Sequence, residues 1–190
     1  SHGPALLRQG HELVTISAGA LADPALETSL TDAARAGKTQ LHIASGAIGA
    51  LDALSCAATG TLQTVHYTGR KPATGWQGSH AETVLNLDTL TKPTPHFNGT
   101  ARAAATLYPK NANVAAAVAL AGIGFDATTA ELIADPTTSQ NSHEIHATGD
   151  FGTLTFTIAG NALPTNPKTS ALAAMSIVRA VQKRISPVTV

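Results

Sequence analysis

A strand, a helix and a second strand follow one another near the start of the chain, and this order constrains the fold more than any other feature. Residues 13–17 form a short apolar, β-branched run that predicts a strand. Asp23 and Pro24 predict the start of a helix, because Asp caps helices and Pro favours the first helical position. Gly37 predicts its end, and residues 40–44 predict a second strand. Such a unit has parallel strands and a right-handed crossover.

The composition limits the kinds of molecule that we expect the protein to bind. Of the 190 residues, 43% are hydrophobic and only 4% aromatic, so we expect a core built from Ala, Leu, Val and Ile. Basic and acidic residues number 12 each, which gives no reason to expect a nucleic acid or an anionic membrane as partner. Two glycines interrupt the longest apolar run, residues 114–125, so it is too short to span a membrane. The single cysteine, Cys56, and the lack of a signal segment lead us to expect a cytoplasmic location.

The rest of the chain mixes helices with consecutive strands. Residues 70–94 are rich in Lys, Pro, Gly and Thr and predict loops with one short element near Val84. One helix is predicted after residues 45–49 and ends at Ala58, and a second begins at Gly99 and ends before Pro109. A third is predicted over residues 112–121 with Asn111 as its cap, and the last begins at Asn166-Pro167. Strands are predicted over residues 62–68, 130–134, 143–148 and 153–158. Consecutive strands late in the chain indicate an antiparallel or mixed sheet.

Residues 122–127 match the dinucleotide fingerprint G-x-G-x-x-A in letters only. The fingerprint needs a strand before it and a helix after it, whereas here a helix precedes it and a strand follows. We therefore interpret the two glycines as the end of a helix. The turn over residues 17–24 contains one glycine, Gly19, and so is not a glycine-rich phosphate loop. If this unit belongs to a nucleotide-binding domain, it is the second half of that domain. The chain opens at Ser1, and we interpret it as part of a longer protein.

The histidines of His143-Glu144-Ile145-His146 invite comparison with the zinc motif H-E-x-x-H, but the spacing is one residue short. On a strand, His143 and His146 point to opposite faces and cannot share a metal ion, so no metal site is expected. By residue type alone, His143 is more often structural or exposed than catalytic.

Two segments are candidates for binding an anionic ligand. Residues 166–170, with the sequence Asn-Pro-Lys-Thr-Ser, would place a lysine and two hydroxyls at a helix N-terminus, where backbone N–H groups and the dipole favour anions. An ordinary capped helix with a solvated lysine is an equally good interpretation. Residues 45–49 follow a parallel strand, where open α/β sheets bind ligands, although a plain strand-to-helix turn also needs glycine.

Several segments together resemble the L-aspartate dehydrogenase family and come in that family's order. The segments are residues 18–23, 45–49, 68–72, 109–115, 133–136, 143–145 and 166–174. Pro-Lys-Asn-Ala-Asn-Val at 109–114 and Asn-Pro-Lys-Thr-Ser at 166–170, present together, are the most specific. The family's N-terminal glycine-rich phosphate loop has no counterpart in this sequence.

The resemblance implies a fold, a cofactor and site residues. It implies an α/β fold with the C-terminal half of a Rossmann-type nucleotide domain over residues 1–46. A catalytic and dimerisation α+β domain with a mixed sheet follows over 47–168, and a C-terminal helix over 169–190 returns to the nucleotide domain. It also implies NAD or NADP as cofactor and a homodimer. In this sequence, the matching catalytic residue is His143, and the cofactor contacts are Ala47 and Asn113.

The expected reaction is oxidative deamination of L-aspartate to iminosuccinate, which hydrolyses to oxaloacetate and ammonia and links the enzyme to NAD biosynthesis. A group that titrates near neutral pH suits the proton transfer, which favours His143. We expect Lys168, Thr169 and Ser170 to bind a substrate carboxylate at the start of the last helix. The alternatives are another two-domain NAD(P)-dependent reductase, similar to dihydrodipicolinate reductase, or a non-catalytic dimerisation or ligand-binding module.

Overall fold

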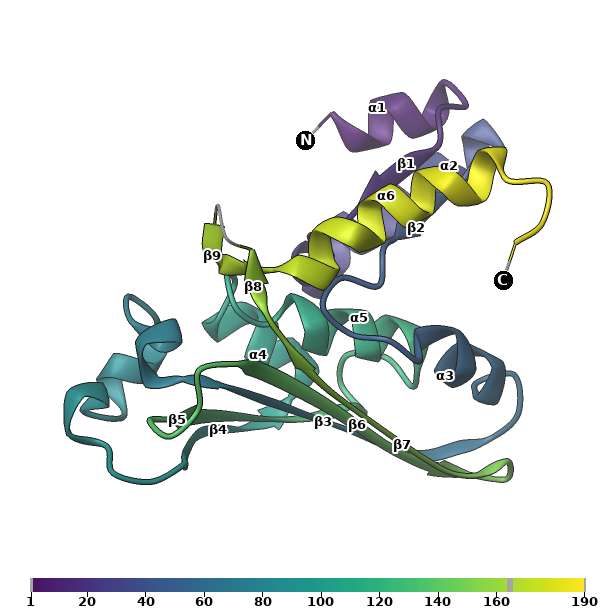
Figure 1. Cartoon of the computed structure of the whole chain (residues 1–190). Helices are drawn as coiled ribbons and strands as arrows, with labels where there is room; N and C mark the ends of the chain where they lie inside the picture. Colours follow the sequence, from purple (N-terminus) through teal and green to yellow (C-terminus); the bar gives the residue numbers. More distant parts are fainter. Residues whose placement is uncertain (1, 164–165, 190) are drawn as a thin grey trace.

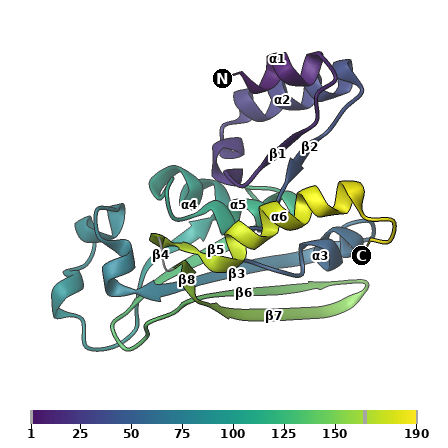
Figure 2. The ribbon, with the colours of Figure 1, turned by 45° about the horizontal axis from the view of Figure 1, so that its top comes forward.

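The structure, a computed structural model, describes residues 2–163 and 166–189, with the side chains of 166–168 outside the description. A small N-terminal unit of helices and two short strands lies against a larger unit built on one long sheet (Figures 1 and 2). The final helix lies beside the N-terminal unit, so the chain returns to where it began. No helix in the described parts is long and apolar enough to cross a membrane.

The N-terminal unit is the predicted βαβ unit. Strands β1 (Leu13–Thr15) and β2 (Leu41–Ile43) pair in parallel, and helix α2 (Pro24–Gly37) connects them. Asp23 caps α2, because its Oδ1 accepts hydrogen bonds from the backbone N–H groups of Ala25, at 2.9 Å, and Leu26. The short helices α1 (Gly3–Arg8) and η1 (Ala18–Ala22) complete the unit. The predicted strand, helix and strand are therefore confirmed.

The larger unit is a five-stranded mixed sheet. Its strand order is β4-β5-β3-β6-β7, with β3 and β5 parallel and the other neighbours antiparallel. The strands are β3 (Leu62–Pro72), β4 (Thr94–Thr100), β5 (Thr129–Asp135), β6 (Asn141–Gly149) and β7 (Gly152–Gly160). Sequence patterns missed β4, because it carries Pro95. This strand lies at the sheet edge, where a missing N–H is tolerated, and its register shifts between Pro95 and Phe97.

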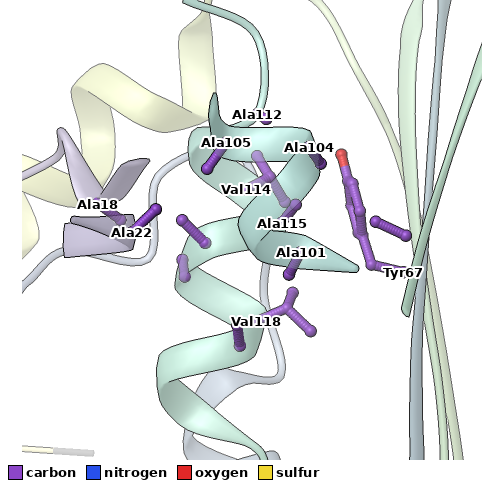
Figure 3. Close-up of a cluster of buried hydrophobic side chains, with 14 of the residues drawn as sticks. Ala18, Ala22, Tyr67, Ala101, Ala104, Ala105, Ala112, Val114, Ala115 and Val118 are labelled. Carbon is purple, nitrogen blue, oxygen red and sulfur yellow. The ribbon is translucent and has the colours of Figure 1, made fainter. Parts of the chain in front are cut away.

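Three helices cover one face of this sheet: α3 (Leu51–Ala57), α4 (Ala101–Leu107) and α5 (Asn113–Ala121) (Figure 1). Small side chains let α4 and α5 approach each other and β3 closely, and Figure 3 shows their alanines next to Tyr67. The alanine-rich core is as expected from the composition. The largest fully buried side chains are nevertheless Trp76, Tyr67 and Tyr108.

The two glycines after α5 end that helix, as predicted. Gly122 is its C-cap, and the N–H of Gly124 bonds to the carbonyl of Ala119 at 2.9 Å. Gly124 has a φ of +84°, a left-handed conformation that glycine adopts without strain. The predicted Asn111 cap is wrong, since α5 begins at Asn113 with Ala112 as its N-cap.

The segment before the last helix also differs from the prediction. Residues 166–170 form strand β9 (Asn166–Ser170), which pairs antiparallel with β8 (Ala162–Leu163). Helix α6 (Ala171–Ile185) begins only after it. A residue before proline is pushed towards extended backbone, and pairing with β8 gives that extended segment hydrogen-bond partners. The predicted helix start at Asn166-Pro167 is therefore wrong by about one turn. Three short helices, η2 (Ala73–Trp76), η3 (His80–Thr83) and η4 (Leu87–Thr89), occupy the predicted loop region.

Candidate active site

A cavity of about 220 Å³ opens where the N-terminal unit, the long sheet and the start of α6 meet. The ends of the two parallel strands contribute Ile16 and residues 44–47 to its wall. The helix-covered face of β3 and β6 contributes Lys71, Asn141 and His143. The other lining residues are Lys110, Asn111, Asn113, Val114, Ala117, Thr169, Ser170 and Ala173. Six separate parts of the chain therefore meet at this cavity.

His143 is buried at the base of the cavity and held by Tyr67. The side chain is 4% exposed, and its Nδ1 lies 2.8 Å from the Tyr67 hydroxyl. Strand β6 pairs with β3 so that His143 lies opposite Gly69. A Cβ at Gly69 would lie 2.6 Å from the Tyr67 hydroxyl, so only glycine leaves room for this hydrogen bond. His146, on the same strand, is exposed on the other face, as the alternation predicts.

Lys71 brings a positive charge into the same cavity. Its Nζ donates a hydrogen bond to Oδ1 of Asn111 at 3.0 Å and lies 4.9 Å from the centre of the Trp76 ring. Trp76 is fixed in turn, because its Nε1 donates to the carbonyl of Ile133 at 3.0 Å. The lysine is thus positioned by an amide and an aromatic face.

Burial changes the protonation of both groups. It lowers the pKa of His143 to about 4, with a further contribution from the charge of Lys71. Burial also lowers the pKa of the Lys71 ammonium to about 8. Near pH 7 the site therefore combines a neutral imidazole with a lysine that is mostly charged. The expectation of a histidine that titrates near neutral pH is wrong, because the argument from residue type could not include its burial.

Comparison with known proteins identifies the family. The family described as "Aspartate dehydrogenase, C-terminal" matches residues 52–184. The chain belongs to the aspartate dehydrogenase family. The resemblance seen in the sequence motifs is therefore confirmed.

Individual members of the aspartate dehydrogenase family agree with this assignment. The L-aspartate dehydrogenase of Ruegeria pomeroyi is 61% identical over 97% of this chain and 67% of its own length. The L-aspartate dehydrogenase of Cupriavidus necator is 51% identical over 97% of this chain and 69% of its own length. This chain thus spans about two thirds of these relatives. The crystal structure of the aspartate dehydrogenase from Thermotoga maritima has the same fold, with a TM-score of 0.80 at 24% identity, covering 100% of this chain and 72% of that one.

Both residues that the family resemblance places at the cofactor line the cavity. Ala47 lies in the turn after β2, and this turn is fixed to α6 by a hydrogen bond from the N–H of Gly46 to Oγ of Ser176 at 3.1 Å. Asn113 is the first residue of α5, and its Oδ1 accepts a hydrogen bond from the N–H of Gly19 at 3.0 Å. These two hydrogen bonds connect the segments that follow β1 and β2 to α5 and α6, and residues of both helices line the cavity.

The residues expected to bind the substrate are placed only in part. Thr169 and Ser170 line the cavity, and the Lys168 side chain lies outside the described residues. Ser170 is the N-cap of α6, although its side chain makes no capping hydrogen bond. The positive, N-terminal end of the α6 dipole therefore still borders the cavity. It lies in the turn that follows Ser170, whereas the sequence prediction placed it at Asn166-Pro167.

Sequence reasoning missed Tyr67, Lys71 and Asn111 as site residues. The strand pattern carried a signal for two of them. Val65, Tyr67 and Gly69 are buried at alternate positions of β3, and continuing the alternation puts Lys71 on the same face. A lysine on the buried face of a strand is unusual enough to mark a functional site. Asn111 carried no such signal, because its contact with Lys71 spans 40 residues.

Proposed function

We propose that the protein catalyses the NAD(P)-dependent oxidative deamination of L-aspartate to iminosuccinate. Hydrolysis of iminosuccinate then gives oxaloacetate and ammonia. The observation that carries this proposal is the position of His143, in the motif shared with the family, at the base of a cavity that holds a cationic lysine. The name L-aspartate dehydrogenase of the relative that is 61% identical supports the choice of substrate.

The lining of the cavity fits the reactive end of a nicotinamide cofactor. Ile16 follows β1, and residues 44–47 follow β2, so the carboxyl ends of two parallel strands open onto the cavity. Ligands of open α/β sheets bind at such ends. Ala47 and Asn113 are the residues that we propose to contact the cofactor. When bound, the cofactor supplies the acceptor for the hydride that leaves the α-carbon of L-aspartate.

His143 is the catalytic residue in this proposal. An ammonium group must lose a proton before hydride can leave the adjacent carbon, and a neutral imidazole can accept that proton. The Tyr67 hydroxyl is bonded to Nδ1, so Nε2 is the nitrogen left to face the substrate. Burial raises the pKa of the Tyr67 hydroxyl, which therefore stays protonated and holds the ring without becoming charged.

Replacement of His143 tests this role. In the full-length protein, His143→Asn should lower kcat for L-aspartate oxidation about 100-fold or more, the scale of general acid–base catalysis. Asparagine keeps a polar group for Tyr67 and so limits the loss of stability. The matched control is His146→Asn, on the exposed face of the same strand, which should keep its kcat. A kcat near that of the wild type in His143→Asn would remove His143 from the mechanism.

We also propose that Thr169 and Ser170 contact the substrate, with Lys168 as a further candidate. Support comes from the position of Thr169 and Ser170 in the cavity wall and from the N-terminal end of α6 beside them. Backbone N–H groups at a helix start favour a carboxylate. Ser170→Ala should raise KM for L-aspartate about 10- to 100-fold and leave the KM of the cofactor unchanged, since a hydrogen bond to a charged group contributes roughly 1.5–3 kcal/mol.

The domain arrangement is a further part of the proposal. We propose a partial dinucleotide-binding domain over residues 1–46, a catalytic domain over 47–168, and a final segment over 169–190 that returns to the first. Two contacts support the return: Arg184 forms an ion pair with Glu12, and Ser176 bonds to Gly46. The resemblance also implies a homodimer, which light scattering of the full-length protein would test.

A further inference from the structure

Lys71 is a charged side chain that the proposed reaction does not yet use. It belongs to the buried face of β3, two positions after Gly69, and it points into the cavity near His143. Its Nζ is held between Oδ1 of Asn111 and the ring of Trp76. An ammonium group has three N–H donors, so the bond to Asn111 leaves two for a ligand in the cavity.

The cavity has no protein counter-ion for this charge. Among the described residues, no carboxylate lies within ion-pairing distance of Lys71, and none lines the cavity. Two partly buried arginines behave differently: Arg70 pairs with Asp135 at 3.1 Å and Arg102 pairs with Asp126 at 2.7 Å. Lys71 is partly buried as well, and a charge withdrawn from water is costly unless a counter-ion or a ligand offsets it.

We propose that the Lys71 ammonium binds one carboxylate of the substrate in this cavity. The inference rests on the proposed function and names the residue that recognises an acidic amino acid there. Asn111 and Trp76 position the ammonium, and the ligand supplies the missing negative charge. L-Aspartate carries two carboxylates, and the N-terminal end of α6, which also lines the cavity, is suited to the other.

The carboxylate also explains why a lysine can lie close to a catalytic histidine. The charge of Lys71 contributes to the low pKa of His143, and burial lowers the pKa of Lys71 itself to about 8. A bound carboxylate favours the charged form of Lys71, so the lysine stays an ammonium while substrate is present. It is therefore a binding group in the complex, and His143 remains the proton acceptor.

The test measures binding separately from turnover. Succinate, which is L-aspartate without its amino group, is titrated by calorimetry into the full-length protein saturated with NAD. We expect Lys71→Met to weaken succinate binding about 10-fold or more, equivalent to about 1.4 kcal/mol. The matched control is Lys92→Met, an exposed lysine outside the cavity, which should bind succinate as the wild type does. Thermal unfolding should show Lys71→Met to be at least as stable as the wild type, because a partly buried charge without a carboxylate partner is removed.

Kinetics then separates a binding role from a proton-transfer role. We expect Lys71→Met to raise KM for L-aspartate about 10-fold or more while kcat and the KM of the cofactor change little, the signature of lost binding. L-2-Aminobutyrate, which has a methyl group in place of the side-chain carboxylate, identifies the carboxylate bound. A smaller preference for L-aspartate over this substrate in Lys71→Met assigns the side-chain carboxylate, and equal losses on both substrates assign the α-carboxylate.

Three results would overturn the proposal: undetectable succinate binding by the wild type, equal succinate affinity in the wild type and Lys71→Met, or a collapse of kcat with KM unchanged. The last result would make Lys71 the proton acceptor. Failure of the proposed function looks different. A wild-type protein that binds succinate through Lys71 but does not oxidise L-aspartate would keep the carboxylate site and refute the reaction.

Discussion

The two buried histidines predict an acid-sensitive fold, and the sign follows from their pKa values. Burial lowers the pKa of both His96 and His143 from 6.5 to about 4, with nearby positive charges contributing. As the pH falls below 6.5, the unfolded chain takes up protons at these histidines and the folded protein does not. Stability therefore increases with pH in this window, because the unfolded state binds more protons. Above pH 7 both states are neutral at these positions, and the effect disappears.

The expected loss of stability at acidic pH is large compared with the free energy of unfolding of an ordinary domain. At pH 5 an ordinary histidine is almost fully protonated, whereas one with a pKa of about 4 is mostly neutral. The difference lowers the free energy of unfolding by about 2 kcal/mol for each histidine, or ~4 kcal/mol for both, relative to pH 8. Typical domains have only about 5–15 kcal/mol. The Nε2 of His96 is buried without a hydrogen-bond partner among the described residues, in keeping with the burial that lowers the pKa of this histidine.

Urea unfolding at intervals between pH 5 and 8 measures this dependence. The carboxyl groups of Glu12, Asp126 and Asp135 have lowered pKa values, so their contribution is lost at lower pH. Replacing both His96 and His143 by glutamine should flatten the dependence, and each single replacement should remove about half of it. A wild-type protein with the same free energy of unfolding at pH 5 and pH 7 would refute the reasoning.

Three further outcomes follow from the same site. Stability should rise again from about pH 8 towards 10.5, because Lys71 loses its proton in the folded protein before it does so in the unfolded chain, and this rise should be absent in Lys71→Met by urea unfolding. Tyr67→Phe should lower kcat about 10-fold with little change in KM, because the His143 ring loses the bond that orients it. Gly69→Ala should lower both the melting temperature and kcat, since the added Cβ would lie 2.6 Å from the Tyr67 hydroxyl.

The sequence predicts most of the fold, because local patterns and local structure agree in most segments. Asp23 and Pro24 predict the start of α2, and the alternation in residues 153–158 predicts β7. The failures are places where a distant partner decides the conformation. β4 forms at the edge of the sheet despite Pro95, and residues 166–170 become a strand because β8 pairs with them. Neither pairing can be read from the segment alone.

The candidate site is predictable only in part, for a related reason. The family motifs identify His143, Ala47 and Asn113, and all three line one cavity. They give no indication of the contacts that set the chemistry of the site. The bond between Tyr67 and His143 joins strands 76 residues apart, and the bond between Lys71 and Asn111 joins a strand to the start of a helix. Both depend on the register of β3 with β6 and on the packing of α5.

Burial also changes which group of the site titrates closest to neutral pH. In water a histidine titrates near neutral pH and a lysine well above it. Here burial lowers both pKa values, His143 to about 4 and Lys71 to about 8, so the lysine is the group closer to neutrality. Each shift suits a different requirement. A histidine that stays neutral at pH 7 is always ready to accept a proton, and a lysine that has no acidic partner in the described part of the cavity keeps its charge for an incoming carboxylate. A binding step and a proton transfer can thus share one small cavity, because the anion that Lys71 attracts also offsets the positive charge that makes His143 a weaker base.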